Sequence, residues 1–345
     1  MKKFINKPEN FVEEFMEGIL AAYGDRVKTL DPEKKILVRS EKPAAGKVGI
    51  VTAGGSGHLP VFLGYVGAGM LDGCAVGEVF ASPSAKKMED MIRYVDQGNG
   101  VLCLYGNYGG DVMNFEMACE NLDFDGIRTE QVLVKDDVAS RPKEEADMRR
   151  GGAGMVYAFK VAGAAADEML SLDEVAQTAR EALENIRTMG FALTPCIVPM
   201  AGKATFSIGE NDLELGMGIH GEPGIEVCEM KPADEIADIV LDKLLDDMPV
   251  ASGEEVSVMI NGLGATPLEE LFILYRRVHE RLKEKGISVY MPHVGEFATS
   301  MEMAGASITV FRLNNKMKKY LRKAADTPFY TNCLLYTSPS PRDCS

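Results

Sequence analysis

The sequence has 345 residues, of which 46% are hydrophobic and 26% are charged, and its formal net charge is −15. A chain of this length and composition can form one large or two medium-sized globular domains. Its acidic balance argues against binding to nucleic acid or to an anionic membrane surface, because both would repel it, but it does not exclude small phosphorylated ligands. The N-terminal residues contain no apolar signal region and no run is long enough to span a bilayer, so we expect a cytoplasmic protein.

Seven cysteines are present, with no C-x-x-C pair, and most of them stand in apolar runs such as VLCLYG. This context is typical of reduced, buried thiols rather than of metal or redox ligands. We therefore expect no metal site on this chain.

Strand-like and helix-like segments alternate in the first half of the chain. Phe11, Phe15 and Ile19 recur at helical spacing, which predicts an amphipathic helix over residues 10–23. Short apolar runs predict strands at 47–52, 74–80, 101–105 and 130–135, and helices are expected over 84–97 and 112–122. Repeated strand, loop and helix is typical of an α/β layer with a buried, mostly parallel sheet.

The second half changes character near residue 190. Two helices, 155–170 and 171–189, precede that point, and the second opens with Ser171 and Glu174 at capping-box spacing. Short β-like runs (CIVPM, ATFSI, ELGMGI) follow it, and then come predicted helices at 233–247, 268–285 and 315–325 and strands at 256–260, 287–291 and 307–313. The predicted fold is therefore α/β, with two α/β domains, 1–190 and 191–330, whose sheets are mixed or mostly parallel. We expect the last helix to pack back on the first domain.

The final residues, 331–345, contain turn-forming residues and no helical or strand period. Within them, residues 333–343 (CLLYTSPSPRD) resemble the translation of a transposase-type sequencing adapter. We interpret 331–345 as a non-native tail and exclude it from the fold prediction. The alternative is a natural disordered tail.

A glycine-rich segment, AGGSGHLP at residues 53–60, directly follows an apolar strand. Its glycines permit φ > 0 and close backbone approach, and ligands bind at the carboxyl ends of strands in α/β sheets. Neither common nucleotide motif is present, because Pro60 replaces the last glycine of G-x-G-x-x-G and no G-x-x-x-x-G-K-[ST] occurs. A tight turn is the simpler explanation of the glycines, but His58 adds an imidazole that suits proton transfer.

A second glycine-rich segment, YGNYGGDVMNF at residues 105–115, ends a predicted strand and begins a predicted helix. Asp111 stands where the helix is expected to begin, so a helix N-cap is the simpler interpretation. The functional alternative is a carboxylate that acts as a general base on a substrate hydroxyl.

The third segment, LGMGIHGEPGIE at residues 215–226, places His220 between glycines, which leaves room for a ligand beside the imidazole. A structural role and a ligand-facing role both stay open for this histidine. Of the remaining histidines, His279 lies in a charged helix and is expected on the surface. His293 follows a strand without an obvious partner, and we interpret it as structural.

Six motifs, GGSGH, NYGGDVMNFE, RRG, KVAGAAA, GMGIHGEPGI and NGLGATPLEEL, occur in this order. Together they make the chain resemble the substrate-binding subunit of the dihydroxyacetone kinase family, up to about residue 330. The resemblance implies two α/β domains and a homodimer. It also implies that His220 forms a hemiaminal with the ketone carbon of a small ketose, and that Asp111 and His58 are the acid/base pair for its hydroxyl protons. The residues that would contact the substrate oxygens are Gly55, Ser56, Gly57, His58, Gly106 and Asp111.

One position departs from the family pattern. Many members carry a lysine where this chain has Gly106. Losing that side chain removes a cationic donor beside the ligand and opens volume. We therefore expect a substrate larger than dihydroxyacetone, such as the four-carbon ketose erythrulose.

The resemblance also implies which ligands and partners to expect. The chain lacks the helical nucleotide-binding domain that some members append, so no cofactor is expected on it. A separate nucleotide-binding kinase subunit would carry Mg-ATP or Mg-ADP. In many bacterial systems a phosphotransferase-system donor recharges that nucleotide, and in others ATP is used directly; both alternatives stay open.

The main alternative is a ketose-binding transcriptional co-regulator without kinase activity. Retention of His58, Asp111 and His220 together favours the kinase, because binding alone needs no base. A free-standing nucleotide-binding α/β enzyme is a third interpretation, which the lack of a phosphate-binding loop disfavours.

Overall fold

The computed structural model describes residues 2–333, which form two six-stranded sheets and eight α-helices. The first sheet has the strand order β1-β2-β4-β3-β5-β6. Its strands are β1 (Val27–Thr29), β2 (Ile36–Arg39), β3 (Gly49–Ser56), β4 (Gly73–Val79), β5 (Val101–Gly106) and β6 (Thr129–Val134). Strands β4, β3, β5 and β6 are parallel, and β1 and β2 extend one edge in antiparallel fashion. Strands of a covered parallel ladder are buried on both faces, which explains their near-continuous apolar runs.

The second sheet has the order β11-β10-β12-β7-β8-β9. Its strands are β7 (Ile186–Ala192), β8 (Asp212–Leu215), β9 (Glu226–Glu229), β10 (Glu255–Gly262), β11 (Ser288–Gly295) and β12 (Gly305–Leu313). Only β10 and β11 pair in parallel, and the other neighbours are antiparallel. The prediction of an α/β fold with mixed sheets is confirmed, and the mostly parallel arrangement holds for the first sheet alone.

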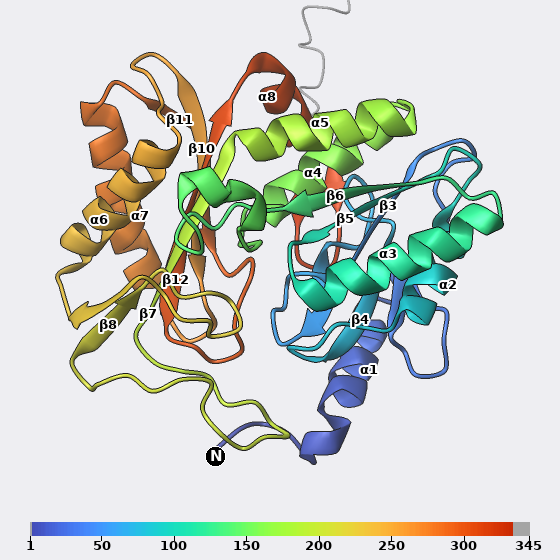
Figure 1. The fold of residues 1–345 in the computed structure, drawn as a ribbon, viewed down its shortest axis with the longest axis horizontal. Helices are drawn as coiled ribbons and strands as arrows, with labels where there is room; N and C mark the ends of the chain where they lie inside the picture. The colour runs from blue at the N-terminus through green and yellow to red at the C-terminus, as the bar shows by residue number, and fades with distance from the viewer. Residues whose placement is uncertain (1, 334–345) are drawn as a thin grey trace, which may run out of the picture.

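The helices and sheets form five layers, which Figure 1 shows from its left to its right side. Helices α6 (Ala233–Asp247) and α7 (Leu268–Glu284) cover the outer face of the second sheet. Helices α2 (Ala85–Val95) and α3 (Gly109–Phe124) cover the outer face of the first sheet. The remaining helices, α1 (Phe11–Tyr23), α4 (Met155–Ala166), α5 (Leu172–Glu184) and α8 (Asn315–Arg322), share a third core that includes residues of both sheets.

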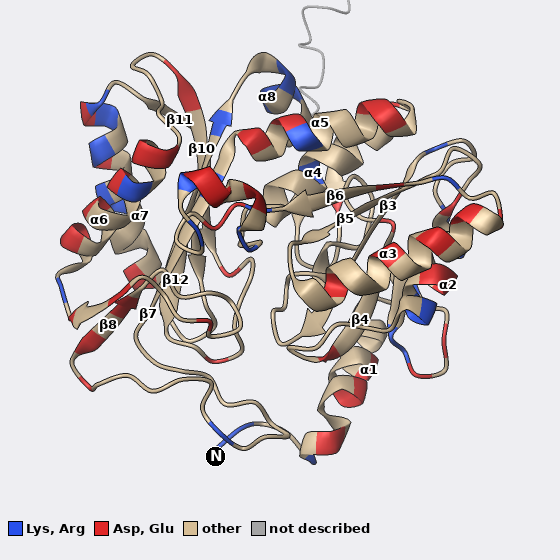
Figure 2. Cartoon of the chain, viewed as in Figure 1, with Lys and Arg blue, Asp and Glu red and all other residues tan. Residues whose placement is uncertain are grey.

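Helix α4 lies at the centre of that third core, and all of its twelve residues are buried. Its sequence, MVYAFKVAGAAA, is small and apolar, and Figure 2 shows it almost free of charge. Tyr157 packs its ring against Phe311 of β12, with a centroid distance of 5.4 Å, and its hydroxyl accepts a hydrogen bond from Ser257 of β10. On the other side, α4 contacts β3 and β5. One helix therefore holds the two sheets at a fixed separation.

The predicted helix over 171–189 was wrong in its second part. Helix α5 begins with the predicted capping box of Ser171 and Glu174 but ends at Glu184, and β7 starts at Ile186. Asn185 ends the helix, and the residues after it pair with β12 in antiparallel register. Here the pairing with β12 outweighs a helical period that continues in the sequence.

Two further boundaries differ from the sequence prediction. The strand predicted at 47–52 continues to Ser56, so half of the glycine-rich segment belongs to β3. The runs CIVPM and ATFSI form no strands but share a single bridge between Ile197 and Ala204, and only the first two residues of ELGMGI belong to a strand, β8. Most residues of CIVPM and ATFSI are also at least partly exposed, so these short apolar runs predicted neither strand pairing nor burial.

The last described residues meet the expectations in part. Helix α8 packs on α4, as predicted, and the buried Lys160 Nζ donates a hydrogen bond to Tyr320 O at 2.7 Å. Thr331–Asn332 form β14, which pairs with β13 (Ala325–Asp326), so the expectation that this segment has no strand was wrong at its start. The predicted tail at 334–345 lies outside the described residues, and the predicted boundary near 190 stays a prediction. Among residues 2–333, no helix is both long and apolar enough to cross a membrane.

The central position of α4 makes a testable prediction about two helix-interior glycines. A Cβ at Gly163 would lie 2.5 Å from the Met70 backbone, whereas a Cβ at Gly18 in α1 would have nothing within 4 Å. We expect Gly163→Ala to lower the free energy of unfolding by about 2 kcal/mol, because overpacking outweighs the gain in helix propensity. Gly18→Ala should raise it by about 0.5–1 kcal/mol. Urea unfolding of both variants checks this, and a stabilised Gly163→Ala would show that α4 has room to move.

Candidate active site

His58 stands just beyond the carboxyl end of β3 and is fully buried. Its Nδ1 lies 2.8 Å from Thr299 O. Because a carbonyl oxygen only accepts, Nδ1 carries the proton and Nε2 keeps a free lone pair. Burial, and then the charge of His220, lower the pKa of His58 to about 3, although the Thr299 carbonyl opposes this. His58 is therefore a neutral imidazole whose Nε2 has no hydrogen-bond partner among the described residues.

The Thr299 carbonyl is placed by a buried asparagine of the second sheet. Asn261, in β10, accepts hydrogen bonds from the backbone N–H groups of Phe297 and Ala298 at 2.8 Å, and its amide donates to Ala298 O. The same loop joins the first sheet, since Thr299 N donates to His58 O. Asn261 belongs to the motif NGLGAT, so this motif acts on the site through the loop that it shapes.

The glycines around His58 are explained mainly by packing. A Cβ at Gly54 would lie 2.0 Å from the Phe62 ring, and one at Gly55 would lie 2.7 Å from Ala81 N. Only Gly57 has a positive φ, of 100°. The glycines were expected to permit φ > 0 and close backbone approach, and only Gly57 uses the positive φ, because Gly54 and Gly55 lie in β3.

Ser56 and Phe80 complete the wall around His58. The Ser56 hydroxyl donates to Gly77 O at 2.9 Å and keeps its lone pairs for a second partner. The Phe80 ring stacks on His58 with a centroid distance of 4.8 Å. Phe80 has φ of 58°, a conformation that is uncommon for a bulky residue and is found at functional sites.

Asp111 lies in the first turn of α3 and is 5% exposed. The N-cap residue of α3 is Tyr108, so the simpler interpretation of Asp111 as an N-cap was wrong. Its Oδ1 is buried without a hydrogen-bond partner among the described residues. Burial raises the pKa of Asp111 to about 6, although Ser82 and the charge of His220 pull it down. A carboxylate in this state accepts a proton near neutral pH.

His220 lies in the turn that joins β8 to β9, and its side chain is 21% exposed. Three rings meet it edge-on: His58 at 4.5 Å, Tyr108 at 4.6 Å and Phe80 at 5.4 Å between centroids. The structure thus brings His220 from the second sheet against His58 from the first. When its ring is protonated, His220 also lowers the pKa of Asp111.

His220 is held by a carboxylate, Glu222, that the sequence analysis did not single out. Glu222 Oε1 lies 2.9 Å from His220 Nδ1, and Glu222 Oε2 accepts the His220 backbone N–H at 2.9 Å. Burial raises the pKa of Glu222, but the hydrogen bond from His220 and the charges of His220 and Arg150 outweigh it and lower the pKa to about 2. Glu222 is therefore ionised, His220 carries its proton on Nδ1, and Nε2 is left free.

Arg150 extends this arrangement away from the site. Its guanidinium lies 3.9 Å from Glu222 and makes two hydrogen bonds to Asp137, of 3.1 and 2.9 Å. The neighbouring Asp136 accepts the backbone N–H groups of Gly152 and Gly154, which fixes the loop that carries Arg150. The sequence does show an acidic run, DD at 136–137, and a basic run, RR at 149–150. These two runs are the signal that could have indicated this pairing.

The space beside Gly106 is occupied. A Cβ at this position would lie 2.9 Å from the Tyr108 ring, whose hydroxyl donates to Gly151 O at 2.7 Å. The expectation that the missing lysine opens volume was therefore wrong, because the Tyr108 ring covers Gly106. The same ring forms one wall of the His220 environment.

The other two histidines lie outside this site. His279 is exposed on α7, as predicted. His293 has partners that the sequence did not reveal, since Nδ1 lies 3.1 Å from Tyr157 Oη and Nε2 lies 3.4 Å from Tyr330 Oη. Within residues 2–333, no three His, Cys, Asp or Glu side chains are grouped to hold a metal ion. The buried thiols that we expected are Cys74, Cys103, Cys119 and Cys196, and Cys344 lies outside the described residues.

The raised pKa of Asp111 makes a prediction about stability. Asp111 keeps its proton up to about pH 6 in the folded protein because its pKa is raised, whereas the pKa of a free aspartate is 3.8. Between these values the folded state binds more protons than the unfolded chain, so stability falls as the pH rises through this window. We expect Asp111→Asn to be more stable than the parent by on the order of 2 kcal/mol at pH 8, and to lose this advantage below about pH 4.

Urea unfolding at pH 4 and pH 8 measures this difference. Asp123→Asn, on the exposed side of the same helix, is the control and should follow the parent at both values. Equal parent and Asp111→Asn stabilities at pH 8 would show that burial does not strain this carboxylate.

Curated relatives match the chain over almost its full length. It is 44% identical over 330 residues to the dihydroxyacetone-binding subunit DhaK of a PTS-dependent dihydroxyacetone kinase from Listeria innocua, covering 96% of this chain and 99% of the relative. It is 41% identical over 334 residues to an L-erythrulose kinase from Pectobacterium atrosepticum, where 96% of this chain matches 56% of the longer relative.

Solved structures show the same architecture. A dihydroxyacetone kinase of C. freundii superposes with a TM-score of 0.88 at 30% identity, over 99% of this chain and 64% of that one. The dihydroxyacetone kinase operon co-activator Dha-DhaQ superposes with a TM-score of 0.87 at 32% identity, over 93% of this chain and 98% of that one. The two-sheet fold is thus shared by proteins named as a kinase and as a regulator.

The family model of the Dak1 domain matches residues 17–329. That range contains both sheets, the β3 loop, the first turn of α3 and the turn that carries His220. The order of the motifs, the two-sheet architecture and the relatives agree over the same residues. The chain belongs to the Dak1 domain family.

Proposed function

We propose that this chain is the substrate-binding subunit of a dihydroxyacetone-type kinase. It would hold a short ketose covalently on His220 while a partner subunit phosphorylates the terminal hydroxyl. The observation that supports this most is the imidazole of His220. Its Nδ1 is hydrogen-bonded to the ionised Glu222, and it lies against the buried His58, whose Nε2 has no partner. Such a site offers a nucleophile and unsatisfied proton acceptors together.

In the proposed first step, the lone pair of His220 Nε2 forms a bond to the ketone carbon. The π electrons of the carbonyl move to its oxygen, which takes up a proton from solvent. The ring keeps its Nδ1 proton and becomes positively charged, and the ionised Glu222 balances that charge. The product is a hemiaminal that fixes the orientation of the ketose. Glycerol has no carbonyl, so this step would also select against it.

In the proposed second step, the terminal hydroxyl attacks the phosphoryl group of the donor. The oxygen–phosphorus bond forms, the bond between the phosphoryl group and its leaving oxygen breaks, and Asp111 accepts the hydroxyl proton. A pKa of about 6 suits this task near neutral pH. His58 Nε2 would accept a hydrogen bond from a substrate hydroxyl. The backbone of Gly55 and Gly57 and the Ser56 hydroxyl would contact substrate oxygens, and Gly106 would lie beside them.

The phosphoryl donor belongs to a partner in this proposal. A magnesium-bound adenine nucleotide on a separate kinase subunit would supply the transferable phosphoryl group, directly from ATP or after recharging by a phosphotransferase-system donor. The dihydroxyacetone-binding subunit from Listeria innocua is named as PTS-dependent, which supports the second source. A homodimer of this chain is part of the same proposal.

The substrate would be dihydroxyacetone or a related short ketose such as erythrulose. Relatives named for each sugar are similarly close, at 44% and 41% identity. At Gly106 the Tyr108 ring, rather than empty space, would set the length of ketose that fits beside His220. We propose a preference for a four-carbon ketose, and the Tyr108 ring would determine whether such a ketose fits.

Covalent capture can be tested with the chain alone. We expect [2-13C]dihydroxyacetone and the equivalent erythrulose to lose their ketone carbon signal on binding, and intact mass to increase by one ketose. His220→Ala should abolish both changes, whereas His279→Ala, which alters an exposed histidine on α7, should leave them unchanged. No adduct with any short ketose, under conditions that preserve a labile hemiaminal, would remove the main support for the mechanism.

The role of Glu222 can be tested in the presence of the partner subunit. Glu222→Gln keeps the size of the side chain but removes the charge that balances the His220 ring. We expect kcat/KM for the ketose to fall by about a hundredfold, since a charge-assisted hydrogen bond of roughly 3 kcal/mol is lost. Adduct formation should fall with it, and an unchanged adduct would restrict Glu222 to a structural role.

Substrate size can be tested by steady-state kinetics with both sugars. Gly106→Ala places a Cβ 2.9 Å from the Tyr108 ring and should push that ring toward the ligand. We expect the ratio of kcat/KM for erythrulose to that for dihydroxyacetone to fall by about tenfold, or roughly 1.4 kcal/mol. If the parent turns over dihydroxyacetone faster than every tetrulose, the preference for a larger substrate is wrong.

The second candidate function is a ketose-binding co-regulator. The chain superposes on an operon co-activator with a TM-score of 0.87, so the fold supports a regulator as well as it supports a kinase. Phosphorylation of the captured ketose by a nucleotide-binding subunit supports the kinase. Ketose capture without turnover, with ketose-dependent binding to a transcription factor, would support the regulator.

A further inference from the structure

Strand β6 has an open edge. Among the described residues, it is the last strand of the first sheet and pairs only with β5. The hydrogen bonds at both ends of this pairing, Val101 N to Arg128 O and Asn107 N to Val134 O, use even-numbered residues of β6 and its flank. Because successive residues direct their backbone groups to opposite edges, the odd-numbered residues point outward. Outside the ladder between β5 and β6, no backbone hydrogen bond among the described residues uses the N–H or C=O group of Gln131 or Leu133.

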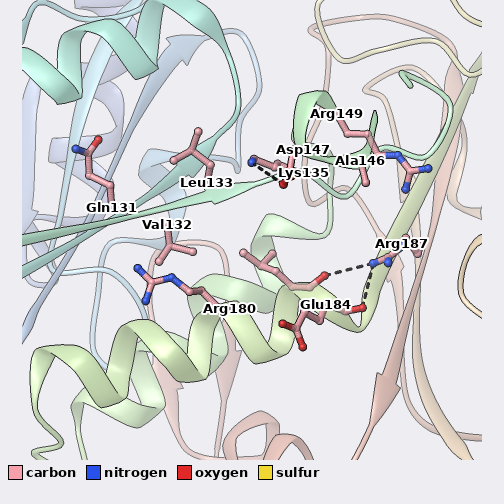
Figure 3. Close-up of a pocket in the computed structure, with 11 residues that line it drawn as sticks. Gln131, Val132, Leu133, Lys135, Ala146, Asp147, Arg149, Arg180, Glu184 and Arg187 are labelled. Carbon is pink, nitrogen blue, oxygen red and sulfur yellow. Dashed lines mark hydrogen bonds and ion pairs between the residues drawn. The ribbon is translucent and has the colours of Figure 1, made fainter. Parts of the chain in front are cut away.

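This edge faces a groove of about 480 Å³ between β6, α5 and the 3-10 helix η3 (Lys143–Met148). Figure 3 shows the strand crossing above α5, with Gln131 and Leu133 on one side and Val132 on the other. Arg180 and Glu184 of α5 form the lower wall, as Figure 3 labels. An exposed strand edge is a template for another extended segment, and the groove leaves space for one.

The charges of the groove differ from those of the chain. Its lining contains four basic side chains, Lys135, Arg149, Arg180 and Arg187, and two acidic ones, Asp147 and Glu184, whereas the whole chain carries 37 basic and 52 acidic residues.

Two of the basic side chains have replaceable partners. Lys135 pairs with the fully exposed Asp147 at 3.3 Å, and Arg180 pairs with Glu130 at 2.8 Å while 44% exposed. Exposed pairs contribute little, so an incoming carboxylate can take the place of either acid.

The other two basic side chains are committed to the fold. Arg149 is buried and binds Asp247 through two hydrogen bonds, of 3.0 and 2.6 Å. Arg187 also binds Asp247 and donates to the carbonyls of Leu183 and Glu184 at the end of α5. These contacts keep the groove open on one side and leave Lys135 and Arg180 as the residues available to a ligand.

An extended peptide fits the groove better than a free small anion or a second copy of the chain does. A small anion would leave the outward N–H and C=O groups of β6 unused. The edge of β6 in a second copy would lie between its own α5 and η3, so two recessed edges could not meet. An extended peptide reaches the edge and satisfies its backbone groups.

We propose that the open edge of β6 binds an extended, acidic segment of a partner protein by strand addition. The partner backbone would pair with Gln131 and Leu133, and its alternate side chains would place carboxylates against Arg180 and Lys135. None of the residues that line this groove belongs to the His220 site. The proposal therefore stands independently of the proposed kinase function.

Hydrogen exchange tests the edge directly. In the free protein the amides of Gln131 and Leu133 should exchange rapidly, while those of Val132 and Val134, which face β5, should be protected. The probe is the peptide Glu-Val-Glu-Val-Glu-Val-Glu with blocked ends, and its addition should slow exchange at Gln131 and Leu133. Protection of both amides in the free protein would overturn the proposal, because the edge would already be paired.

Fluorescence polarisation with the same labelled peptide tests the charge and the backbone separately. We expect Arg180→Glu to weaken binding by at least tenfold, and Leu133→Pro, which removes one outward N–H, to do the same. Arg276→Glu, at a comparably exposed arginine on α7, is the matched control and should bind as the parent does. A peptide with lysine for glutamate should bind more weakly than the acidic one.

Each remaining result decides the proposal. Binding that is unaffected by both Arg180→Glu and Leu133→Pro, or equal binding of the acidic and basic peptides, would overturn it. Failure of the acidic peptide to bind at millimolar concentration would overturn it as well. Should Leu133→Pro fail to fold, Arg180→Glu together with the exchange data still gives the answer.

Discussion

Helix α4, buried on all sides between two sheets, is the constraint on which the rest of the structure depends. Each sheet packs an inner face toward this helix and an outer face toward its own helices. Interiors packed this densely resist compression and sliding. Loops that leave the two sheets at the same end therefore meet with a defined geometry, and the contact of His58 with His220 is one result.

The site around this contact is destabilised by buried polar atoms that the fold itself does not satisfy. His58 Nε2 and Asp111 Oδ1 are both buried without a partner among the described residues. A buried polar atom left unsatisfied costs about 1–3 kcal/mol. Polar atoms in this condition are expected where a ligand completes the hydrogen bonding, and both lie in the segments that carry the family motifs. The empty site is therefore less stable than a site in which a ligand satisfies these two atoms.

The sequence predicted the residues of this site better than it predicted their partners. His58, Asp111 and His220 stand in glycine-rich segments at strand ends, and such local patterns are visible in one chain. Thr299 is 241 residues from His58 along the chain, so no local pattern connects them. The extra strand at Ile186 was missed for a similar reason, since its partner β12 lies more than a hundred residues away. Contacts of this range depend on packing, which periodicity and propensity do not encode.

The errors at glycine have a different physical origin. Gly54, Gly55 and Gly106 were interpreted as providing freedom or space for a ligand, but a Cβ at each of them would meet protein atoms at 2.0–2.9 Å. At these three positions the glycine reflects the lack of room for a side chain, but the sequence does not reveal what occupies that space. Only the folded chain distinguishes a ligand from a neighbouring ring.

His220 is carried by the last two strands of the second sheet, and this placement affects how the protein loses activity. Strands β8 and β9 are four residues long each, and β9 is paired on one side only, with most of its residues exposed. Short, exposed edge elements open at lower free energy than a buried core does. Heat or denaturant should therefore unfold β8 and β9, and displace the proposed nucleophile His220 with them, while α4 and the remaining strands stay folded. Inactivation would precede the cooperative transition, and a global melting temperature would overstate the range in which the protein works.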